Sequence, residues 1–376
     1  MQIDAIDVYH LALPLVRPQR TDLGEFDKLE TVLVRIQSGG SAGWGEATPG
    51  SAPLAASEWA EGVFGCVRRW LAPAIAGRWI DSGNALQGRL APFQGNRFAK
   101  AALDIAWWDL KARSQNLPLY KLFDSQRESL EVGASFDRMD TIDELLESIR
   151  RAFDAGYSRA ELKLRPGWDV HMLNAVRQEF PVETFHTDIE GTMRLDHMEL
   201  LCRMDDFSMA MVEQPLAADD LVGHAMVQEA VRTPVCLDEA VTTPEQADMA
   251  LELHSCRYMN IRPGRVGGIT PAIAIHDACR DAGVPCRAGA TPQTAIGTRA
   301  VLALATKSNF NYPADYFPSQ ETLRQDVFDP LAAAKDADDG KLRVHLWTEA
   351  GLGVEPNLEL LGSLALNHAR IEAGKP

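Results

Sequence analysis

Apolar and polar residues follow two different regimes along this chain. Residues 2–15 and 29–38 alternate in the manner of strands, with a polar connection between them. Residues 56–77 and 97–113 instead repeat their apolar side chains with the period of an amphipathic helix. Strands and helices that do not alternate regularly predict an α+β domain over residues 1–125.

From about residue 129 the pattern becomes a regular alternation of strand and helix. Seven strand–helix units follow in series, and residues 309–317 add an eighth, weaker strand. Such a series predicts an α/β fold over residues 126–320, a TIM-like (β/α) barrel modified to (β/α)7β in its last unit. Residues 321–376 are interpreted as loop and short strand, and we expect them to pack back on the first domain.

Three acidic residues recur at the ends of predicted barrel strands. Asp188, Glu213 and Asp238 each follow an apolar run and are spaced 25 residues apart. One strand, one helix and two loops fill about this length, so the three should meet at the carboxyl ends of successive parallel strands. Such carboxylates repel one another, and a hard divalent cation relieves the repulsion. Oxygen-only ligands favour Mg²⁺ over zinc, with Mn²⁺ as an alternative.

Basic and amide side chains are expected at the same rim. Period-two alternation places Glu161 and Lys163 on one side of the second strand, and Lys163 could act as a general base. Arg262 ends the sixth strand, where it either stabilises an oxyanion or substrate carboxylate, or pairs with Glu239 or Glu161. Gln293 ends the seventh strand as a pocket residue.

The polar segment around Gly24 leaves two interpretations open. It lies between the first two predicted strands, over residues 16–28. It could be a mobile segment that covers a site, or a plain hairpin connection.

Composition narrows the classes of partner. A net charge of −16 without a basic stripe argues against nucleic acid. No apolar run is long enough for a membrane span, and the N-terminus alternates like a strand rather than a signal peptide. The six cysteines form no CxxC pair and are interpreted as reduced thiols of a cytoplasmic protein. The expected partners are a small-molecule carboxylate and further copies of the chain.

Six motifs follow one another along the chain: AKAALDIAWWDLKAR, LKLRPGWD, VEQPL, TPVCLDEA, MNIRPGRVGG and TAIG. In this order they resemble the enolase superfamily, muconate-lactonising subgroup, and within it the o-succinylbenzoate synthases and N-acylamino acid racemases. The resemblance implies a cap built from both chain ends over a Mg²⁺ site, and removal of a proton α to a carboxylate through an enediolate. It implies Asp188, Glu213 and Asp238 as ligands, Lys163 as the catalytic lysine, and a substrate-covering loop at Gly24.

Four positions depart from the family pattern. Glu161 and Arg262 stand where lysines are usual, Glu190 replaces an Asn, and Gln293 replaces a Glu. Glu161 should raise the pKa of Lys163 and weaken it as a base, unless Mg²⁺ and Arg262 restore a positive field. Arg262 is a poor second base, so a one-base reaction such as a syn-elimination survives better than a two-base racemisation.

We therefore expect a metal-dependent lyase or isomerase with Lys163 and Arg262 as catalytic residues and Gly24, Glu161 and Gln293 near the substrate. Two alternatives remain at this stage. One is a catalytically altered barrel that serves as a small-molecule binding or regulatory protein. The other is an acid-sugar dehydratase, although no His–Asp pair at the sixth and seventh strand ends supports it.

Overall fold

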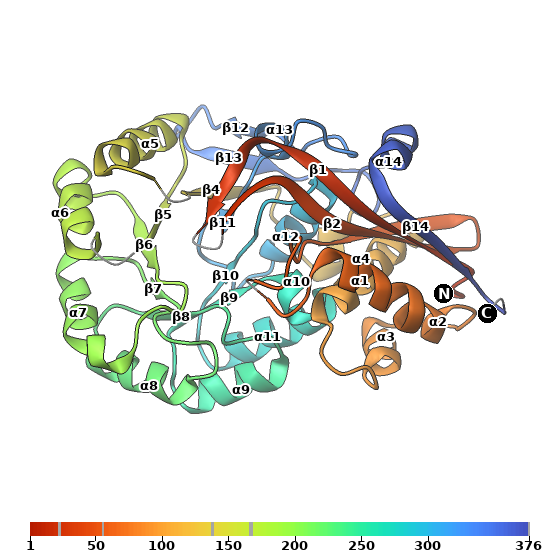
Figure 1. The fold of residues 1–376 in the computed structure, drawn as a ribbon, viewed down its shortest axis with the longest axis horizontal. Helices are drawn as coiled ribbons and strands as arrows, with labels where there is room; N and C mark the ends of the chain where they lie inside the picture. Colours follow the sequence, from red (N-terminus) through yellow and green to blue (C-terminus); the bar gives the residue numbers. More distant parts are fainter. Residues whose placement is uncertain (22–23, 55, 137–138, 165–167, 375–376) are drawn as a thin grey trace.

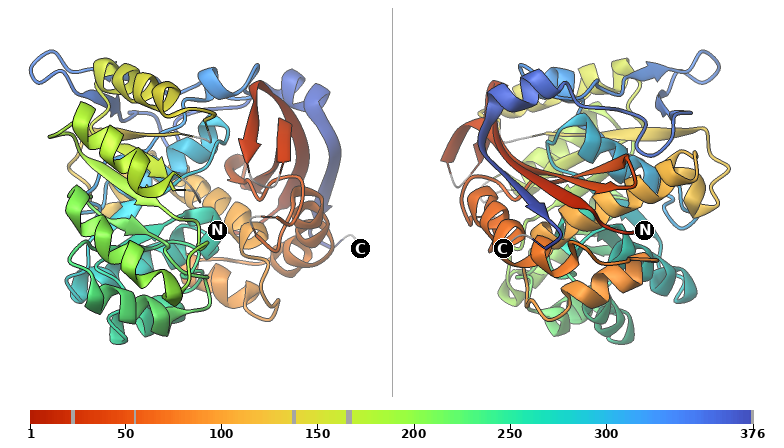
Figure 2. Two further views of the ribbon diagram at one scale, coloured as in Figure 1. Left: turned by 60° about the vertical axis from the view of Figure 1, so that its left-hand side comes forward. Right: turned by 90° about the vertical axis from the view of Figure 1, so that its right-hand side faces the viewer.

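The chain folds into two units that lie side by side (Figure 1). One is a ring of alternating strands and helices, and the other is an antiparallel sheet covered by helices, which we call the cap. Both chain ends lie in the cap (Figures 1 and 2). Among the described residues, no helix has the length and apolar character needed to cross a bilayer. The computed structural model describes residues 1–21, 24–54, 56–136, 139–164 and 168–374.

The cap sheet joins the two ends of the chain. Its order is β14-β1-β2-β3, and every neighbouring pair is antiparallel. In the first strand the core side chains Ile6 and Val8 are fully buried, as the alternating pattern predicts. The four strands are β1 (Ala5–Thr21), β2 (Gly24–Ser38), β3 (Ser41–Ala47) and β14 (Ala365–Glu372).

The polar segment around Gly24, expected to be a loop, is strand over its described residues and extends β1 and β2 as an antiparallel hairpin, which agrees with the second of the two interpretations. Strand β1 pairs with β2 as far as Pro14, and the pairing is irregular between Pro14 and Gln19. It then resumes, with Gln19 opposite Phe26 and Thr21 opposite Gly24. A two-stranded ribbon satisfies its backbone groups across the pair without needing an apolar face, so its polar composition did not reveal it. Residues 22–23 lie outside the described residues.

One helix packs on the cap sheet at unusually short range. Helix α4 crosses β3, where Gly43 and Gly45 allow the contact. A Cβ at Gly45 would lie 2.2 Å from the carbonyl oxygen of Ala102, so any larger residue would push the helix away. The cap helices are α1 (Ala60–Cys66), η1 (Val67–Leu71), α2 (Ala72–Ile75), α3 (Gly83–Leu90), α4 (Arg97–Ser114) and η2 (Leu119–Phe123).

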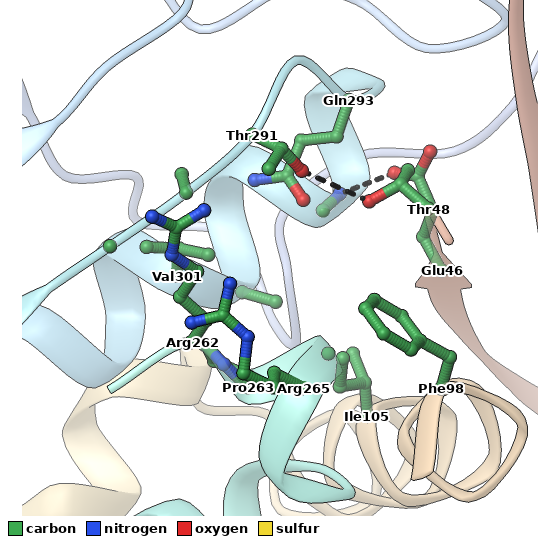
Figure 3. Close-up of a pocket in the computed structure, with 15 residues that line it drawn as sticks. Glu46, Thr48, Phe98, Ile105, Arg262, Pro263, Arg265, Thr291, Gln293 and Val301 are labelled. Atoms are coloured by element: carbon green, nitrogen blue, oxygen red, sulfur yellow. Dashed lines mark hydrogen bonds between the residues drawn. The ribbon is translucent and has the colours of Figure 1, made fainter. Parts of the chain in front are cut away.

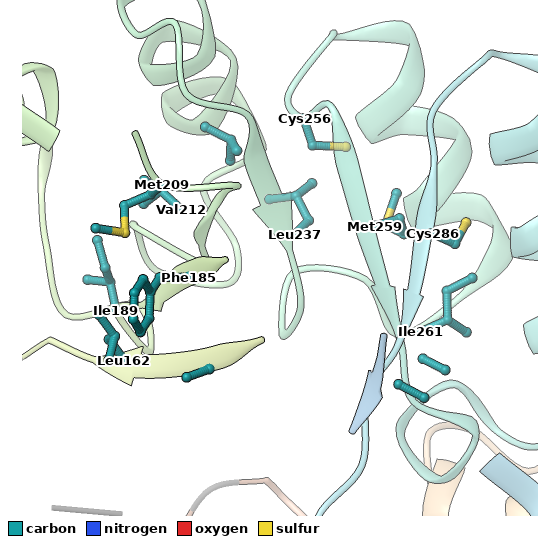
Figure 4. Packing of buried hydrophobic residues seen from close by; sticks show 14 of the residues in the cluster. Leu162, Phe185, Ile189, Met209, Val212, Leu237, Cys256, Met259, Ile261 and Cys286 are labelled. Carbon is teal, nitrogen blue, oxygen red and sulfur yellow. The ribbon is translucent and has the colours of Figure 1, made fainter. Parts of the chain in front are cut away.

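The second unit is the expected barrel. Strands β4 to β10 pair in parallel, each with the next along the chain. Apolar side chains between strands and outer helices form one cluster (Figure 4). The strands are β4 (Ser129–Ser135), β5 (Ala160–Lys163), β6 (Phe185–Asp188), β7 (Val212–Glu213), β8 (Val235–Leu237), β9 (Tyr258–Ile261), β10 (Cys286–Ala288) and β11 (Ala314–Asp315).

The helices between these strands begin and end at recognisable signals. Thr141 caps α5 by accepting from the N–H of Glu144, and Gly156 ends that helix at a φ of 97°. Thr243 caps α9 in the same way and is followed by a proline at the first helical position. The helices are α5 (Ile142–Ala155), α6 (Asp169–Glu179), η3 (Leu195–His197), α7 (Met198–Arg203), η4 (Met204–Phe207), α8 (Leu221–Ala230), α9 (Pro244–Glu252), α10 (Pro263–Val266), α11 (Ile269–Asp281) and α12 (Ala295–Ala305).

The ring is completed by side chains rather than by a backbone ladder. Strand β11 pairs with β4, whereas next to β10 the described residues show a single bridge, Cys286 to Phe310. Across this seam Arg287 of β10 donates to both carboxylate oxygens of Asp315 of β11, at 2.8 and 2.7 Å. The irregular last unit of the predicted barrel is therefore closed by a buried ion pair.

The last part of the chain contacts both units. Strand β13 pairs antiparallel with β4 of the barrel, and β14 returns to β1 of the cap. The elements here are α13 (Ser319–Thr322), β12 (Ala333–Lys335), β13 (Leu342–His345) and α14 (Leu358–Leu364).

Candidate active site

The predicted site residues lie at the carboxyl ends of adjacent barrel strands. In the parallel ladder Lys163 of β5 is the register partner of Asp188 of β6, and Asp188 is the partner of Glu213 of β7. Asp238 follows the end of β8, two residues beyond Cys236, the register partner of Glu213. The equal spacing in the sequence thus corresponds to neighbouring positions on one rim.

Lys163 is held between carboxylates at the edge of the site. Its Nζ lies 3.5 Å from Asp188 Oδ2 and donates to Glu190, and its side chain is 31% exposed. Burial lowers the pKa of Lys163, but Asp188, Glu161 and Glu190 together raise it above its ordinary value. This is the direction that the sequence argument expects from Glu161.

Glu213 is fully buried between two donors. Asn260 Nδ2 donates to its Oε1 at 2.7 Å, and Arg287 donates to its Oε2. Arg262 Nη2 lies further away, 3.8 Å from Oε1. The negative charge of Glu213 is therefore already balanced from inside the barrel.

Asp238 is paired with two arginines. Arg265 donates to Oδ1, and Arg262 Nη2 lies 2.7 Å from Oδ2, although at an angle that makes no hydrogen bond. Arg262 therefore forms an ion pair, one of the two roles considered for it, but with Asp238 rather than with Glu239 or Glu161. Glu239 pairs instead with Arg265, at 3.0 Å.

Below the rim a buried ionic network fills the barrel. Arg287 Nη1 contacts His186 Nε2 at 2.6 Å and Glu213, while its Nη2 contacts Glu161 at 3.3 Å and Asp315. Glu161 is thus turned into the network, where it also accepts from Ser135 at 3.1 Å, and is absent from the described pocket linings. Arg159 lies in the same network and pairs with Asp315.

The sequence analysis did not identify Arg159, Arg287 and Asp315 as members of this network. Each was visible only as a charged residue within or next to an apolar strand run, in SRAEL, PCRAG and YPADY. A buried charge in such a run needs a partner, but a single sequence does not tell which of the distant charges provides it.

Between cap and barrel lies a pocket of about 60 Å³ (Figure 3). Glu46 and Thr48 approach it from the cap, opposite Arg262, and Gln293 lies at its rim. Two buried donors, Gln293 Nε2 and Arg262 Nε, have no hydrogen-bond partner. Both residues line the pocket, so these two buried donors lie beside the space where a ligand could bind.

The Gly24 ribbon borders a second, larger pocket. This pocket measures about 200 Å³ and is lined by Phe26 and Lys28 of β2 and by Thr291 of the barrel. Gly24 itself is exposed and is not among its described lining residues.

Comparison with known proteins settles the family. Residues 5–123 match the mandelate racemase / muconate lactonizing enzyme N-terminal domain. Residues 144–360, more than half of the chain, match the family described as enolase C-terminal domain-like. The chain belongs to the enolase superfamily. The expected family and its fold, a cap and a (β/α) barrel, are confirmed.

Relatives of this superfamily member match it over nearly the whole chain. It is 36% identical over 331 residues to an o-succinylbenzoate synthase of Geobacillus kaustophilus, which covers 88% of each chain. It is 34% identical over 362 residues to an N-succinylamino acid racemase of Amycolatopsis sp., covering 96% of this chain and 97% of the relative. The structure of an enolase-superfamily protein from Listeria innocua superimposes with a TM-score of 0.93 at 28% identity, covering 99% of both chains. The chain is accordingly an enzyme of the enolase superfamily.

Charge balance in this superfamily member fits a divalent cation. The charged side chains at the rim and in the network below it comprise seven acids and five bases. With His186 counted as neutral, this set has an excess of two negative charges. Burial and the neighbouring Glu213 raise the pKa of Asp188 well above its ordinary value, and burial and Asp238 raise that of Glu239 to about 7. The acids are Glu161, Asp188, Glu190, Glu213, Asp238, Glu239 and Asp315, and the bases are Arg159, Lys163, Arg262, Arg265 and Arg287.

The distances between possible metal-ligand atoms, taken alone, select a different set of residues for the metal ion. Among the described residues, Glu161, His186 and Glu213 are the group whose ligand atoms lie within 4.8 Å of one another. Arg287 Nη1 contacts both His186 and Glu213, so a positive charge already lies among these three. Positive charge also lies at the rim, because Arg262 and Arg265 flank Asp238, but the rim holds one buried acceptor that makes no hydrogen bond, Asp238 Oδ2. This acceptor, together with the raised pKa of Asp188 beside Glu213, fits a cation at the rim.

Proposed function

We propose that this chain removes the proton α to a carboxylate in a Mg²⁺-dependent reaction, with Mn²⁺ as a substitute, and that Lys163 is its single base. The observation that carries the proposal is the position of Lys163 at the end of β5, 3.5 Å from Asp188, the first of three strand-end carboxylates. The names of the relatives, o-succinylbenzoate synthase and N-succinylamino acid racemase, both contain a succinyl group. A succinyl-bearing carboxylate is therefore the proposed substrate class.

Asp188, Glu213 and Asp238 would hold the metal ion. When bound, the cation supplies positive charge that stabilises negative charge developing on the substrate carboxylate. The excess of two acids among the charged groups of the site supports this assignment, as does Asp238 Oδ2, which makes no hydrogen bond although it forms an ion pair with Arg262. The protein contributes the fixed positions of the three strand ends.

Lys163 must be neutral at Nζ to accept the proton. Its ion pairs with Asp188 and Glu190 oppose this, because both carboxylates favour the charged ammonium. Once Asp188 is engaged by a cation, Lys163 loses part of the negative field that raises its pKa. Metal binding and base strength are therefore coupled through Asp188.

Arg262 provides fixed positive charge beside Asp238 and does not act as a second base. A guanidinium stays protonated in proteins, so Arg262 cannot take a proton from the opposite face of the substrate. Its unpartnered Nε, together with Nε2 of Gln293, can instead donate to a carbonyl or carboxylate acceptor. This arrangement favours a one-base elimination, as in o-succinylbenzoate synthesis, over two-base racemisation.

Hydrogen exchange in D₂O tests the assignment. The enzyme is incubated with Mg²⁺ and a panel of N-succinyl-L-amino acids, and loss of the α-proton signal is followed by NMR. We expect exchange in the native enzyme, none in Lys163→Ala, and undiminished exchange in Lys341→Ala, a surface lysine paired with Glu131. Exchange that persists in Lys163→Ala refutes the role of the lysine. Exchange unaffected by EDTA refutes the metal.

Arg262→Lys separates the two reaction types. A lysine there provides a second group that can be deprotonated, at the end of β9 and thus four strands along the ring from Lys163 at the end of β5. We expect this variant to convert N-succinyl-L-amino acids to the D form faster than the native enzyme does, as measured by chiral chromatography. Equal or faster racemisation by the native enzyme contradicts the one-base assignment.

A further inference from the structure

Glu46 is a cap residue whose carboxylate is buried against the barrel. It lies near the end of β3, is 4% exposed, and accepts from the hydroxyl of Thr31 within the cap at 2.8 Å. From the barrel, Thr294 donates its N–H at 3.2 Å and its hydroxyl at 2.6 Å, and Gly297 donates its N–H at 3.1 Å. Oε1 of Glu46 therefore accepts from both units and Oε2 from the barrel, so the carboxylate bridges cap and barrel.

The barrel groups that Glu46 binds belong to the first turn of α12. Thr294 is the N-cap of this helix, and Gly297 is its third residue. The N–H groups of a first turn have no partner within the helix, and its positive dipole end favours a carboxylate. Asp326 accepts the N–H of Ala295 at 2.7 Å. The first turn is thus fastened by two carboxylates from outside the barrel.

Gln293 immediately precedes this turn, so the same contacts fix its position. A Cβ at Gly297 would lie 2.5 Å from Glu46 Oε2 and 2.6 Å from Gln293 Oε1, which shows how closely the two side chains meet there. Gln293 Nε2 is buried without a partner in the pocket that Arg262 shares (Figure 3). Nearby, Thr48 and Thr291 add a second contact between cap and barrel, with their hydroxyls 3.4 Å apart.

We propose that Glu46 is a positioning residue for substrate: by clamping the first turn of α12 to the cap, it fixes the Gln293 amide opposite Arg262 and so determines where the acceptor group of the substrate lies. This inference rests on the proposed function. Glu46 and Gln293 line the pocket, whereas Lys163 is not among its described lining residues, so we assign Glu46 a role through Gln293 rather than on the proton transfer itself. Weakening the clamp should therefore impair binding of substrate more than the chemical step.

Asp104 provides a matched control. It is a fully buried cap carboxylate on α4, and it accepts the N–H of Thr270 in the first turn of α11 at 3.0 Å and the amide of Gln87 at 2.9 Å. It thus makes the same kind of contact between cap and barrel helix, but it is not among the described residues lining the pocket of Gln293. Asp104→Asn and Glu46→Gln should lower stability by comparable amounts.

The first readout needs no substrate. An amide in place of the carboxylate of Glu46 cannot accept at both oxygen positions, so one backbone N–H of the turn loses its partner. Hydrogen–deuterium exchange by mass spectrometry should be faster in Glu46→Gln for peptides covering residues 293–298, and unchanged there in Asp104→Asn. Unchanged protection of this turn in Glu46→Gln overturns the clamp.

The second readout is the division between KM and kcat for α-proton exchange with N-succinyl-L-amino acids. Loss of one directed hydrogen bond corresponds to about a tenfold rise in KM, which we expect for Glu46→Gln with a change in kcat of less than about threefold. Asp104→Asn should leave KM within about twofold, a difference smaller than that of one weak hydrogen bond. An unchanged KM in Glu46→Gln, or an equal rise in Asp104→Asn, overturns the positioning role. If the native enzyme shows no α-proton exchange with these substrates, the proposed function is refuted. The amide hydrogen–deuterium exchange of residues 293–298 still tests the Glu46 clamp independently.

Discussion

Replacing Arg287 by Met should be the most damaging single substitution in the barrel interior. The Arg287 side chain is fully buried and contacts Glu161, Glu213 and Asp315, of which Asp315 lies across the seam between β10 and β11. Met preserves much of the length and the apolar stem of the side chain but removes the charge. The substitution therefore leaves three buried carboxylates facing a smaller positive charge.

The expected loss follows from the burial of these partners. Removing one member of a buried ion pair costs about 3–5 kcal/mol, because the other charge is left uncompensated in a poorly polarisable interior. Arg159 still pairs with Asp315, but Glu213 is 0% exposed and keeps as close partners the amide of Asn260 at 2.7 Å and the imidazole of His186 at 3.4 Å. We therefore expect a loss of at least about 3 kcal/mol, a large part of the 5–15 kcal/mol that typically stabilises a folded protein.

The loss should depend on pH in a definite direction. Burial raises the pKa of Asp315, but Arg287 and Arg159 lower it below its ordinary value. Burial likewise raises the pKa of Glu161, which His186 and Arg287 bring well below 4.5. Depressed carboxyl pKa values contribute stability above the unfolded values and lose it as pH falls through the folded ones. Without Arg287 both carboxyls protonate at higher pH. The difference between native protein and variant should therefore be largest at pH 8 and shrink toward pH 4.5.

Urea unfolding followed by tryptophan fluorescence at pH 8 and pH 5 measures both effects. Arg150→Met is the control, because Arg150 is 45% exposed and pairs with exposed Glu147 and Glu179, and such surface ion pairs contribute little to stability. A loss for Arg287→Met no larger than that of the control, or one that grows on acidification, would refute the assignment of a buried ionic network.

Three further substitutions test other parts of the structure. Gly133→Ala places a Cβ 1.9 Å from Arg159 Nε and should lower the free energy of unfolding by about 1–3 kcal/mol, and unchanged urea unfolding would contradict the packing described. Asp188→Asn removes a proposed ligand, so calorimetry should show Mg²⁺ binding weakened by at least about tenfold, and equal affinity would remove Asp188 from the ligand set. Glu190→Gln removes one of the anions that raise the pKa of Lys163, so the acidic limb of the pH–rate profile should move to lower pH; a shift to higher pH would contradict the geometry.

The barrel and its rim were predictable because their signals are local and repeated. Strand and helix patterns alternate over nearly two hundred residues, and each candidate ligand follows its own apolar run. Lys163, Asp188 and Glu213 consequently occupy consecutive register positions, as the equal spacing indicates. Period-two alternation also placed Glu161 on the inner side of its strand, where it contacts Arg287.

The partners of these residues were not predictable, because they depend on side chains distant in the sequence. Arg287 and Glu213 are 74 residues apart, and the sequence around neither residue indicates the other as its partner. Arg265 lies in the short helix α10, within the run RPGRVGG, and pairs with Asp238 from there. The extension of β1 and β2 as a polar ribbon was not predicted for a different reason. It is held by backbone pairing, which does not require a particular pattern of apolar and polar side chains.

The cap sheet has a consequence for the order of events during synthesis. Strand β1 is made first, yet one of its two neighbours, β14, is made last, with the whole barrel between them. While the barrel is being translated, β1 therefore carries a row of unpaired backbone groups along one edge, where another chain could add a strand. The edge closes only when residues 365–372 are available, so completion of the cap is necessarily a late step in the formation of the enzyme.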